Sequence, residues 1–282
     1  MAADNLPVTD NHLHVDSMRG LGPVKVGRLF SRSGGTHAMV VNRAVGFSNI
    51  GEFRRAQEAF LSDVGKMNTQ AGIRAFSVVG PHPAALPRLW EVMGKRGAVD
   101  LVRQALESSA GLVREGRATA LGEVGRPHFE VPADVMEASN SILDRSLELA
   151  ADIGCAVQLH MESSTPGQFR ELRARADRAG LPPWRVVKHF SPPLVEAGRE
   201  TGIVPSVIST RENVREALSQ GDRFLMETDY MDDPDRPGAV LGPRTVPRVT
   251  RALLGEGTMD LASARRIHVE NVERTYGIDV SI

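Results

Sequence analysis

The chain has 282 residues, with 34 Lys and Arg against 35 Asp and Glu, and a formal net charge of -1. A charge this close to zero gives no bulk attraction to nucleic acid or to an anionic membrane surface. Hydrophobic residues make up 41% of the chain and charged residues 24%, as in a typical globular protein. The one cysteine, Cys155, excludes an intramolecular disulfide and a Cys-based zinc site, and its apolar surroundings place it in the core.

The first ten residues, MAADNLPVTD, lack the basic and apolar progression of a signal peptide, and no apolar run reaches membrane-spanning length. We therefore expect a cytoplasmic protein with no membrane partner. Lys occurs only at positions 25, 66, 95 and 188, so Arg carries most of the positive charge. An anion-binding site in this chain is therefore expected to use guanidinium groups.

Strand-like apolar runs alternate with helical patterns along the chain. The strand-like runs are residues 8–16, 36–44, 73–83, 117–128, 155–163, 185–191, 202–209 and 223–233. Apolar spacings of three and four predict helices over 49–71, 84–116, 133–153, 166–180, 193–200, 211–220 and within 245–276. A further helical stretch ends at Gly34–Gly35. Glycines near 94 and 97 divide the 84–116 helix, and glycines at 255 and 257 divide the last segment.

Eight strand–helix units predict a parallel sheet closed into a (β/α)₈ barrel, as one domain covering residues 1–282. An open doubly wound sheet is the alternative, but no Gly-x-Gly-x-x-Gly follows the first run. Pro205 is awkward for an inner strand because it removes a ladder donor. Pro205 makes the expected boundaries of the seventh strand less certain, but it does not change the expected fold.

Side chains that bind metals gather at the carboxyl ends of the strand-like runs, where barrel enzymes place their catalytic residues. His12 and His14 alternate in an extended run and so share one face. Alone, such a pair is a weak signal, since it also describes a strand with two half-exposed histidines. The full set at the strand ends is His12, His14, His82, Glu123, His160, His189 and Asp229, with His128 just beyond one end.

This mixture of imidazoles and carboxylates suits zinc, and also manganese, nickel or magnesium. Six such ligands are too many for one catalytic tetrahedral ion that keeps a position open for water. They fit two divalent ions that share a bridging carboxylate and activate a water molecule. Glu123, on the middle strand, is the natural bridge. We therefore expect two divalent ions, with zinc as the first choice.

The chain resembles a TatD-type metal-dependent hydrolase of the amidohydrolase (urease-like) superfamily. The matching segments, in the family's order, are Asp10-Asn11-His12-Leu13-His14 with Asp16, Gly80-Pro81-His82-Pro83, Gly122-Glu123-Val124-Gly125, Leu159-His160, His189-Phe190-Ser191 and Glu227-Thr228-Asp229. The resemblance implies a barrel fold and metal-dependent hydrolysis, with trimming of DNA 3′ ends known for some members.

The resemblance also implies which residues hold each ion. It assigns one ion to His12, His14, Glu123 and Asp229, and the other to Glu123, His160 and His189. Asp229 would also accept the proton of the attacking water as general base. Asp10 is expected to orient one of the ligating imidazoles, because ligating histidines usually need such a partner.

Two segments beside the expected ligands depart from the family's pattern. Met161-Glu162-Ser163 stands where relatives commonly carry an Arg, and Arg126-Pro127-His128 replaces the usual Leu-Asp. The stretch after Asp229 is longer and richer in Pro and Gly than is usual. These differences indicate a divergent branch with a substrate of its own.

The same segments supply candidate substrate contacts. Arg126, Arg236 and Arg244 are candidate anion contacts, although a solvated surface Arg is an equally good interpretation of each. The 231–247 loop is a candidate semi-rigid lid that meets Arg126 and His128 at the barrel mouth. His82 and His128 are expected to line the substrate pocket, the alternative being structural turn histidines. His37 and His268 are expected to have no role.

The first functional hypothesis is hydrolysis of a phosphoester, with a small molecule or a nucleic-acid end as substrate. The alternative within enzymes is hydrolysis of an amide, a lactone or a cyclic C–N bond, which the same centre can perform. A third hypothesis is a non-catalytic protein that binds metal, or metal and nucleic acid. The complete ligand set argues against that third hypothesis, and so does the absence of a strongly basic balance of charge.

Overall fold

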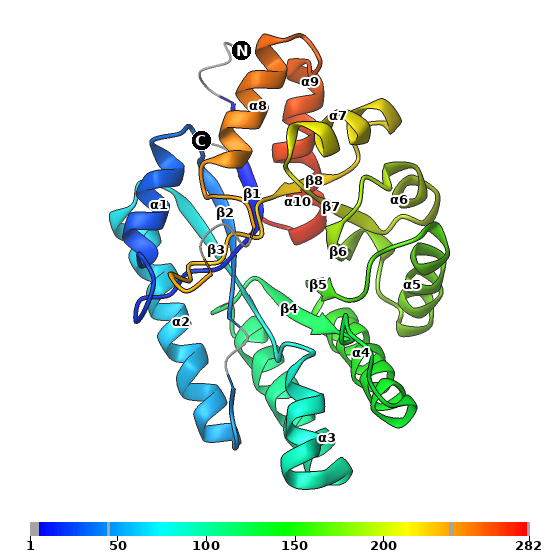
Figure 1. The fold of residues 1–282 in the computed structure, drawn as a ribbon. Coiled ribbons are helices and arrows are strands. Elements are labelled where there is room, and N and C mark those ends of the chain that lie inside the picture. Colours follow the sequence, from blue (N-terminus) through cyan, green and yellow to red (C-terminus); the bar gives the residue numbers. More distant parts are fainter. Residues whose placement is uncertain (1–5, 44–45, 237–239, 281–282) are drawn as a thin grey trace.

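The computed structural model describes residues 6–43, 46–236 and 240–280. Within them, eight strands form one parallel sheet in sequence order (Figure 1). The strands are β1 (Thr9–Leu13), β2 (His37–Val41), β3 (Arg74–Val79), β4 (Ala120–Gly125), β5 (Ala156–His160), β6 (Val186–Ser191), β7 (Val204–Ile208) and β8 (Leu225–Glu227).

Helices follow the strands, and most of them pack around the outside of the sheet (Figure 1). They are α1 (Pro23–Ser31), α2 (Ile50–Gln70), α3 (Ala85–Arg114), α4 (Ala133–Ile153), α5 (Pro166–Ala179), η2 (Pro183–Arg185), α6 (Val195–Thr201), α7 (Arg211–Gln220), α8 (Thr245–Gly255), α9 (Leu261–Arg265), η3 (Arg266–Glu270) and α10 (Asn271–Tyr276).

Backbone hydrogen bonds between the first and last strand regions close the sheet into a barrel. Leu13 forms a parallel bridge with Tyr230. The N–H of His14 donates to the carbonyl of Tyr230 at 2.8 Å, and the N–H of Asp229 donates to the carbonyl of His12 at 2.9 Å. The predicted (β/α)₈ barrel is confirmed. Its closure brings the first and last predicted metal ligands to the same place.

Glycines and one proline, which the sequence analysis singled out, shape the backbone locally. Gly94 has φ 73° inside α3 and kinks that helix, as predicted. Pro205 lies within β7, in register with Lys188 of β6. Its ring packs against Gly198 of α6, where a Cβ would lie 2.7 Å from the proline ring. Gly198 therefore leaves room for the proline ring between β7 and α6.

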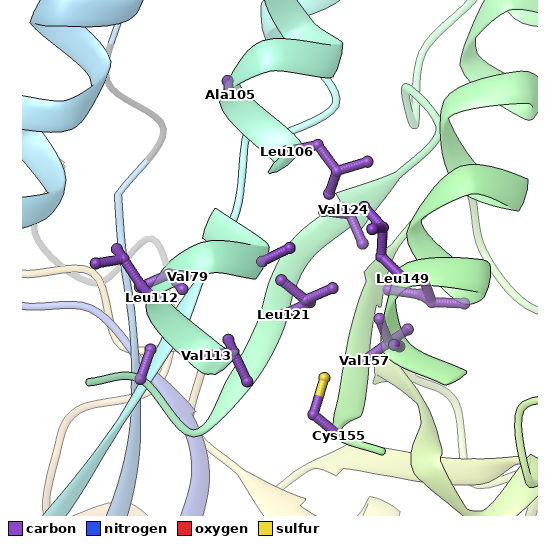
Figure 2. Close-up of a cluster of buried hydrophobic side chains, with 14 of the residues drawn as sticks. Val79, Ala105, Leu106, Leu112, Val113, Leu121, Val124, Leu149, Cys155 and Val157 are labelled. Atoms are coloured by element: carbon purple, nitrogen blue, oxygen red, sulfur yellow. The ribbon is translucent and has the colours of Figure 1, made fainter. Parts of the chain in front are cut away.

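Apolar side chains fill the space between the strands and the helices. Figure 2 shows part of this core, in which Leu106 of α3 and Leu149 of α4 lie close to Leu121 of β4. Cys155 belongs to the same cluster and is 5% exposed, and burial raises the pKa of its thiol to about 11. The prediction that Cys155 is a core residue is confirmed. Among the described residues, no helix combines the length and the apolar character that crossing a membrane requires.

A buried histidine in η3 generates a prediction about acid stability. Burial lowers the pKa of His268 from 6.5 to about 4. Its Nε2 lies 2.8 Å from Thr250 Oγ1, and its Nδ1 lies 3.3 Å from the backbone N of Thr9. The ring therefore ties the end of the chain to β1 in its neutral form.

Because the unfolded chain binds a proton at pH 6.5 and the folded chain does not, His268 lowers stability as the pH falls from about 6.5 towards about 4. The expected loss is about 2 kcal/mol at pH 5 relative to neutral pH. Urea unfolding at pH 7.5 and pH 5 measures it, and His268→Gln should reduce the difference between the two values. An identical difference in both proteins would contradict this account.

Candidate metal centre

The predicted ligands converge at the carboxyl ends of the strands. His12 lies on β1, Glu123 on β4, His160 at the end of β5 and His189 on β6, while Asp229 follows β8 by two residues. Within the described part of the chain, His12, His14 and Glu123 form one group able to hold a cation, and His82, Glu123 and His160 form another. Glu123 belongs to both groups. The barrel therefore assembles one site from residues more than 200 positions apart in the sequence.

The first group has the spacing of a coordination sphere. His12 Nε2 lies 3.1 Å from His14 Nε2 and 2.9 Å from Glu123 Oε1, and His14 Nε2 lies 3.2 Å from that oxygen. Asp229 Oδ1 lies 3.6 and 3.7 Å from the two imidazole nitrogens. Ligands about 2.0–2.1 Å from a tetrahedral zinc ion lie about 3.3 Å from one another. His12, His14 and Glu123 therefore have the spacing to hold a divalent ion, and Asp229 lies beside the two imidazoles.

The two histidines of the first group are held by their other ring nitrogens. His12 Nδ1 lies 2.7 Å from Gln158 Oε1, and His14 Nδ1 lies 3.0 Å from the carbonyl of Val41. Both partners are oxygen acceptors, because Gln158 Nε2 donates to the carbonyl of Asn11 at 2.9 Å and so fixes the orientation of the amide. In the neutral rings that bind a metal, each Nδ1 then carries the proton, which leaves each Nε2 with a lone pair facing the centre.

The second group faces the other oxygen of the same carboxylate. Glu123 Oε2 lies 2.7 Å from His160 Nδ1 and 4.0 Å from His189 Nε2. His160 Nδ1 is buried and, among the described residues, makes no aligned hydrogen bond despite the short distance. His189 Nδ1 lies 3.0 Å from Glu227 Oε1, so its Nε2 faces the centre. His160 and His82 therefore have the spacing to hold a second cation with Glu123, and His189 lies farther from this carboxylate.

The electrostatics of the centre favour a cation between these groups. Burial opposes charge on His14, but hydrogen bonds and attraction from Asp229 and Glu123 outweigh it and raise the pKa of His14 to about 10. Burial likewise opposes charge on Glu123, yet attraction from His12 and His189 holds the pKa of this carboxyl well below its usual value. Burial and the neighbouring His12 lower the pKa of His189, which keeps its lone pair available.

Asp10 supports the centre in a way that corrects the sequence-based expectation. Its Oδ1 accepts the backbone N–H of His12 at 3.2 Å and that of Thr228 at 3.0 Å, and its Oδ2 accepts the Thr228 hydroxyl at 2.7 Å. Burial raises the pKa of Asp10 to about 7. Asp10 thus joins β1 to the segment after β8 through the backbone. The partner that orients the His12 ring is Gln158.

His82 and His128 complete this side of the site. His82 Nδ1 accepts the backbone N–H of Ala84 at 3.1 Å, so the neutral ring carries its proton on Nε2, which lies 3.3 Å from Glu123 Oε2. His128 is exposed, and its Nδ1 lies 2.8 Å from Nε2 of His160. Both residues are therefore placed at the predicted site, and their contact with substrate stays a prediction.

Arg126 lies away from the segment that it was expected to meet. Its buried guanidinium donates to Glu171 at 2.8 Å, to Glu162 at 2.6 Å and to Asn140 at 3.1 Å. By contrast, Asp232 in the 231–247 loop accepts backbone N–H groups from the loop after β1. Figure 1 shows the segment after β8 beside α1, across the barrel from α5. The expectation that Arg126 meets this loop is wrong, because acidic partners on α5 and after β5 hold its side chain.

The other loop residues of the sequence-based site lie at the surface. Arg236 and Arg244 are both exposed, and their binding of an anion stays a prediction. The part of the loop at 237–239 falls outside the described residues.

Sequence reasoning missed two orienting residues, Gln158 and Glu227. Each lies two positions before a predicted ligand, His160 and Asp229 respectively. Because side chains two apart in a strand share a face, both could have been placed inside the barrel from the sequence. Each is a polar residue in an otherwise apolar strand, which is the signal that identifies it.

A (β/α)₈ barrel with imidazoles and carboxylates gathered at the strand ends defines the class of metal-dependent barrel hydrolases. A family model described as TatD related DNase matches residues 9–277. The chain belongs to this family, and the resemblance seen in its motifs is confirmed.

One relative and two solved structures are similar to this chain over nearly their whole length. A protein of Methanocaldococcus jannaschii, described as uncharacterized, is 43% identical over 279 residues, covering 99% of this chain and 98% of that protein. A TatD-like protein from Archaeoglobus fulgidus has a TM-score of 0.65 at 18% identity, covering 96% of this chain and 100% of the other. A phosphotriesterase homology protein from Escherichia coli, with phosphate in its active site, has a TM-score of 0.63 at 12% identity, covering 96% and 99%. At these identities the two solved structures show the shared fold.

The Gln158 contact generates a prediction about metal affinity. Gln158→Leu removes the acceptor that fixes the His12 tautomer, and metal affinity should fall by about 10- to 100-fold. Gln158→Glu keeps an acceptor oxygen and should recover most of that loss. Competition with a chelator of known affinity measures the constant for each variant. If Gln158→Leu binds metal as tightly as the wild type, Gln158 does not orient the ligand.

Proposed function

We propose that the chain is a hydrolase that holds two divalent ions and cleaves a phosphoester, with a nucleic-acid end or a small phosphodiester as substrate. The observation that carries this proposal is the placement of Glu123, whose two oxygens face two separate groups of imidazoles. A carboxylate shared in this way is the bridge of a dinuclear site. Zinc is the first choice of metal, with manganese, nickel and magnesium as alternatives to be compared by reconstitution.

When bound, the ions would supply a water of lowered pKa and neutralise the charge of the phosphoryl oxygens. Asp229 is the side chain placed to take the proton. Its carboxyl is 16% exposed, against 4% for that of Glu123, so a water at the barrel mouth can reach it. His82 presents an Nε2–H toward the same centre and could donate a hydrogen bond to a substrate oxygen.

Two observations support a phosphoester substrate that bears bases. One is membership in the TatD related DNase family. The other is a pair of exposed aromatic side chains beside the histidines: Phe190 follows His189 and is 50% exposed, and Phe129 packs edge-on against His128 and is 43% exposed. Exposed aromatic rings next to a reaction centre are suited to stack on nucleic-acid bases.

A second candidate is hydrolysis of a neutral amide, lactone or cyclic C–N bond. The observation that favours it is Arg126, whose guanidinium is bound by Glu162 and Glu171 and cannot serve as an open anion clamp.

A cytoplasmic location, which rests on the sequence, completes the proposal.

A substrate panel separates the two candidates. The metal-loaded protein is assayed on a phosphodiester with a free 3′ end, a phosphomonoester, and a set of amides and lactones. We expect phosphoester hydrolysis that disappears on chelation and returns with added metal. Turnover of amides or lactones alone would refute the phosphoester proposal in favour of the second candidate. Tight metal binding without turnover of any substrate would favour the non-catalytic hypothesis.

The role of Asp229 generates a separate prediction. Asp229→Asn keeps the side-chain size but cannot accept a proton, so turnover should fall by about 10²–10⁴-fold. Metal binding should persist, because His12, His14 and Glu123 remain. Asp152→Asn, an exposed position on α4, is the matched control and should behave as the wild type. A near-normal rate for Asp229→Asn at unchanged metal content would exclude Asp229 as the base.

A further inference from the structure

A cavity of about 450 Å³ adjoins the metal centre, between α2 and the loops that follow β1 and β2. Sites for small molecules typically measure about 300–1,000 Å³. The walls include Phe47, Phe53 and Phe60, and His82 stands at one side. Since His82 Nε2 lies 3.3 Å from Glu123 Oε2, a molecule held at the centre could extend a group into the cavity.

One polar side chain in the cavity wall is left without a partner. Gln57 on α2 is 3% exposed, and its Nε2 donates to Ser109 Oγ at 2.7 Å. Ser109 Oγ gives its own hydrogen to the carbonyl of Ala105 at 3.0 Å, so it must accept from Gln57. This fixes the orientation of the amide. Gln57 Oε1 is then a buried acceptor with no donor among the described residues.

A buried acceptor without a hydrogen bond is unfavourable, so a ligand that supplies a donor is favoured at this position. Asn42 and Asp63 of the wall already have hydrogen-bond partners. Asn42 donates to the carbonyl of Gly80 at 3.0 Å and accepts its N–H at 2.7 Å, and Asp63 accepts from Lys66 at 2.7 Å. Among the described residues of the wall, Gln57 Oε1 is the buried side-chain atom that has no hydrogen-bond partner.

The apolar part of the wall indicates the shape of that ligand. The Phe47 and Phe53 rings lie 4.9 Å apart between centroids, at an angle of 57°, and Phe60 is 9% exposed. Aromatic walls favour planar rings, through offset and edge-to-face contacts. A ring that is largely apolar and carries one donor at its edge satisfies both the aromatic walls and Gln57.

We propose that this cavity binds a planar heteroaromatic ring of the substrate that bears an amino group, with Gln57 Oε1 accepting the hydrogen bond. An amino-bearing nucleobase has this chemistry. The inference rests on the proposed function, because the ring would belong to the phosphoester whose phosphoryl group lies at the metal centre. It adds a specificity site that acts on binding and takes no part in the chemical step.

Binding of two matched nucleosides tests the proposal without any turnover. The probes are 2′-deoxyadenosine and purine 2′-deoxyriboside, which differ only in the amino group. Calorimetric titration of the metal-loaded protein gives a dissociation constant for each. The wild type should bind 2′-deoxyadenosine about tenfold more tightly, which corresponds to one hydrogen bond to a buried acceptor. Equal constants for the two nucleosides, or no binding of either, would overturn the proposal.

Variants on α2 locate the site. Gln57→Met keeps the side-chain length and removes the acceptor, so the two nucleosides should bind about equally. Thermal unfolding checks that this variant is folded. Ala56→Phe fills the cavity and should weaken both nucleosides by at least tenfold. Ser62→Phe, at an exposed position of the same helix outside the cavity, is the matched control and should bind both as the wild type does. A preference that survives Gln57→Met would place the recognition elsewhere.

Failure of the cavity assignment can be distinguished from failure of the proposed function. Discrimination between the nucleosides without phosphoester hydrolysis would retain the cavity assignment and refute the phosphoesterase. Phosphoester hydrolysis without discrimination would retain the phosphoesterase and refute the cavity assignment.

Discussion

Glu123 lies 3% exposed inside the barrel mouth, with imidazole nitrogens facing both of its oxygens. A carboxylate buried this deeply is costly unless cationic partners or hydrogen-bond donors compensate it. His12 and His14 on one side, with His82 and His160 on the other, meet that need and divide the site in two. The same arrangement requires rigid placement of strands that are far apart in sequence. The closed barrel provides it through the hydrogen bonds between β1 and the segment after β8.

The residues that bind the outer ring nitrogens of the histidines determine which nitrogens face the centre. Gln158 and Glu227 fix which nitrogen of His12 and of His189 faces inward. Glu227 also accepts the backbone N–H of Phe190 at 2.7 Å, where φ is 49°. A bulky residue in this left-handed region is uncommon. One carboxylate therefore positions both a predicted ligand and the exposed ring that follows it.

Much of this arrangement was predictable, because strand periodicity and the position of strand ends are local properties of the sequence. His12 and His14 share a face at a spacing of two, and a barrel brings their strand end to that of Glu123. The partners of a side chain in a neighbouring element are not local. Arg126 illustrates this, since its carboxylate partners lie 36 and 45 residues away and the sequence does not show that they converge. Asp10 likewise reaches Thr228 across 218 residues, so its backbone role became visible only in the structure.

The loops around the barrel mouth give its two sides different contacts and different chemical character. Asp232 is 1% exposed and accepts backbone N–H groups of Asp16, Leu21 and Gly22, which ties the segment after β8 to the loop after β1. Arg43, after β2, pairs with Asp16 and lies 3.6 Å from Asp233. This side borders the apolar cavity, while the Arg126 cluster occupies the side toward α5. The cavity is therefore expected to recognise one ring of the substrate on the side of β1 and β2, while the exposed rings of Phe129 and Phe190 lie after β4 and on β6.

Metal stoichiometry tests the central claim most directly, namely that one carboxylate serves two ions. Elemental analysis after loading with zinc and removal of the excess should give about two ions per wild-type chain. Glu123→Gln should lose most of both ions, because the shared ligand is gone, whereas Glu148→Gln, an exposed position on α4, should keep two. A single ion in the wild type, or two ions retained in Glu123→Gln, would contradict the shared-carboxylate centre.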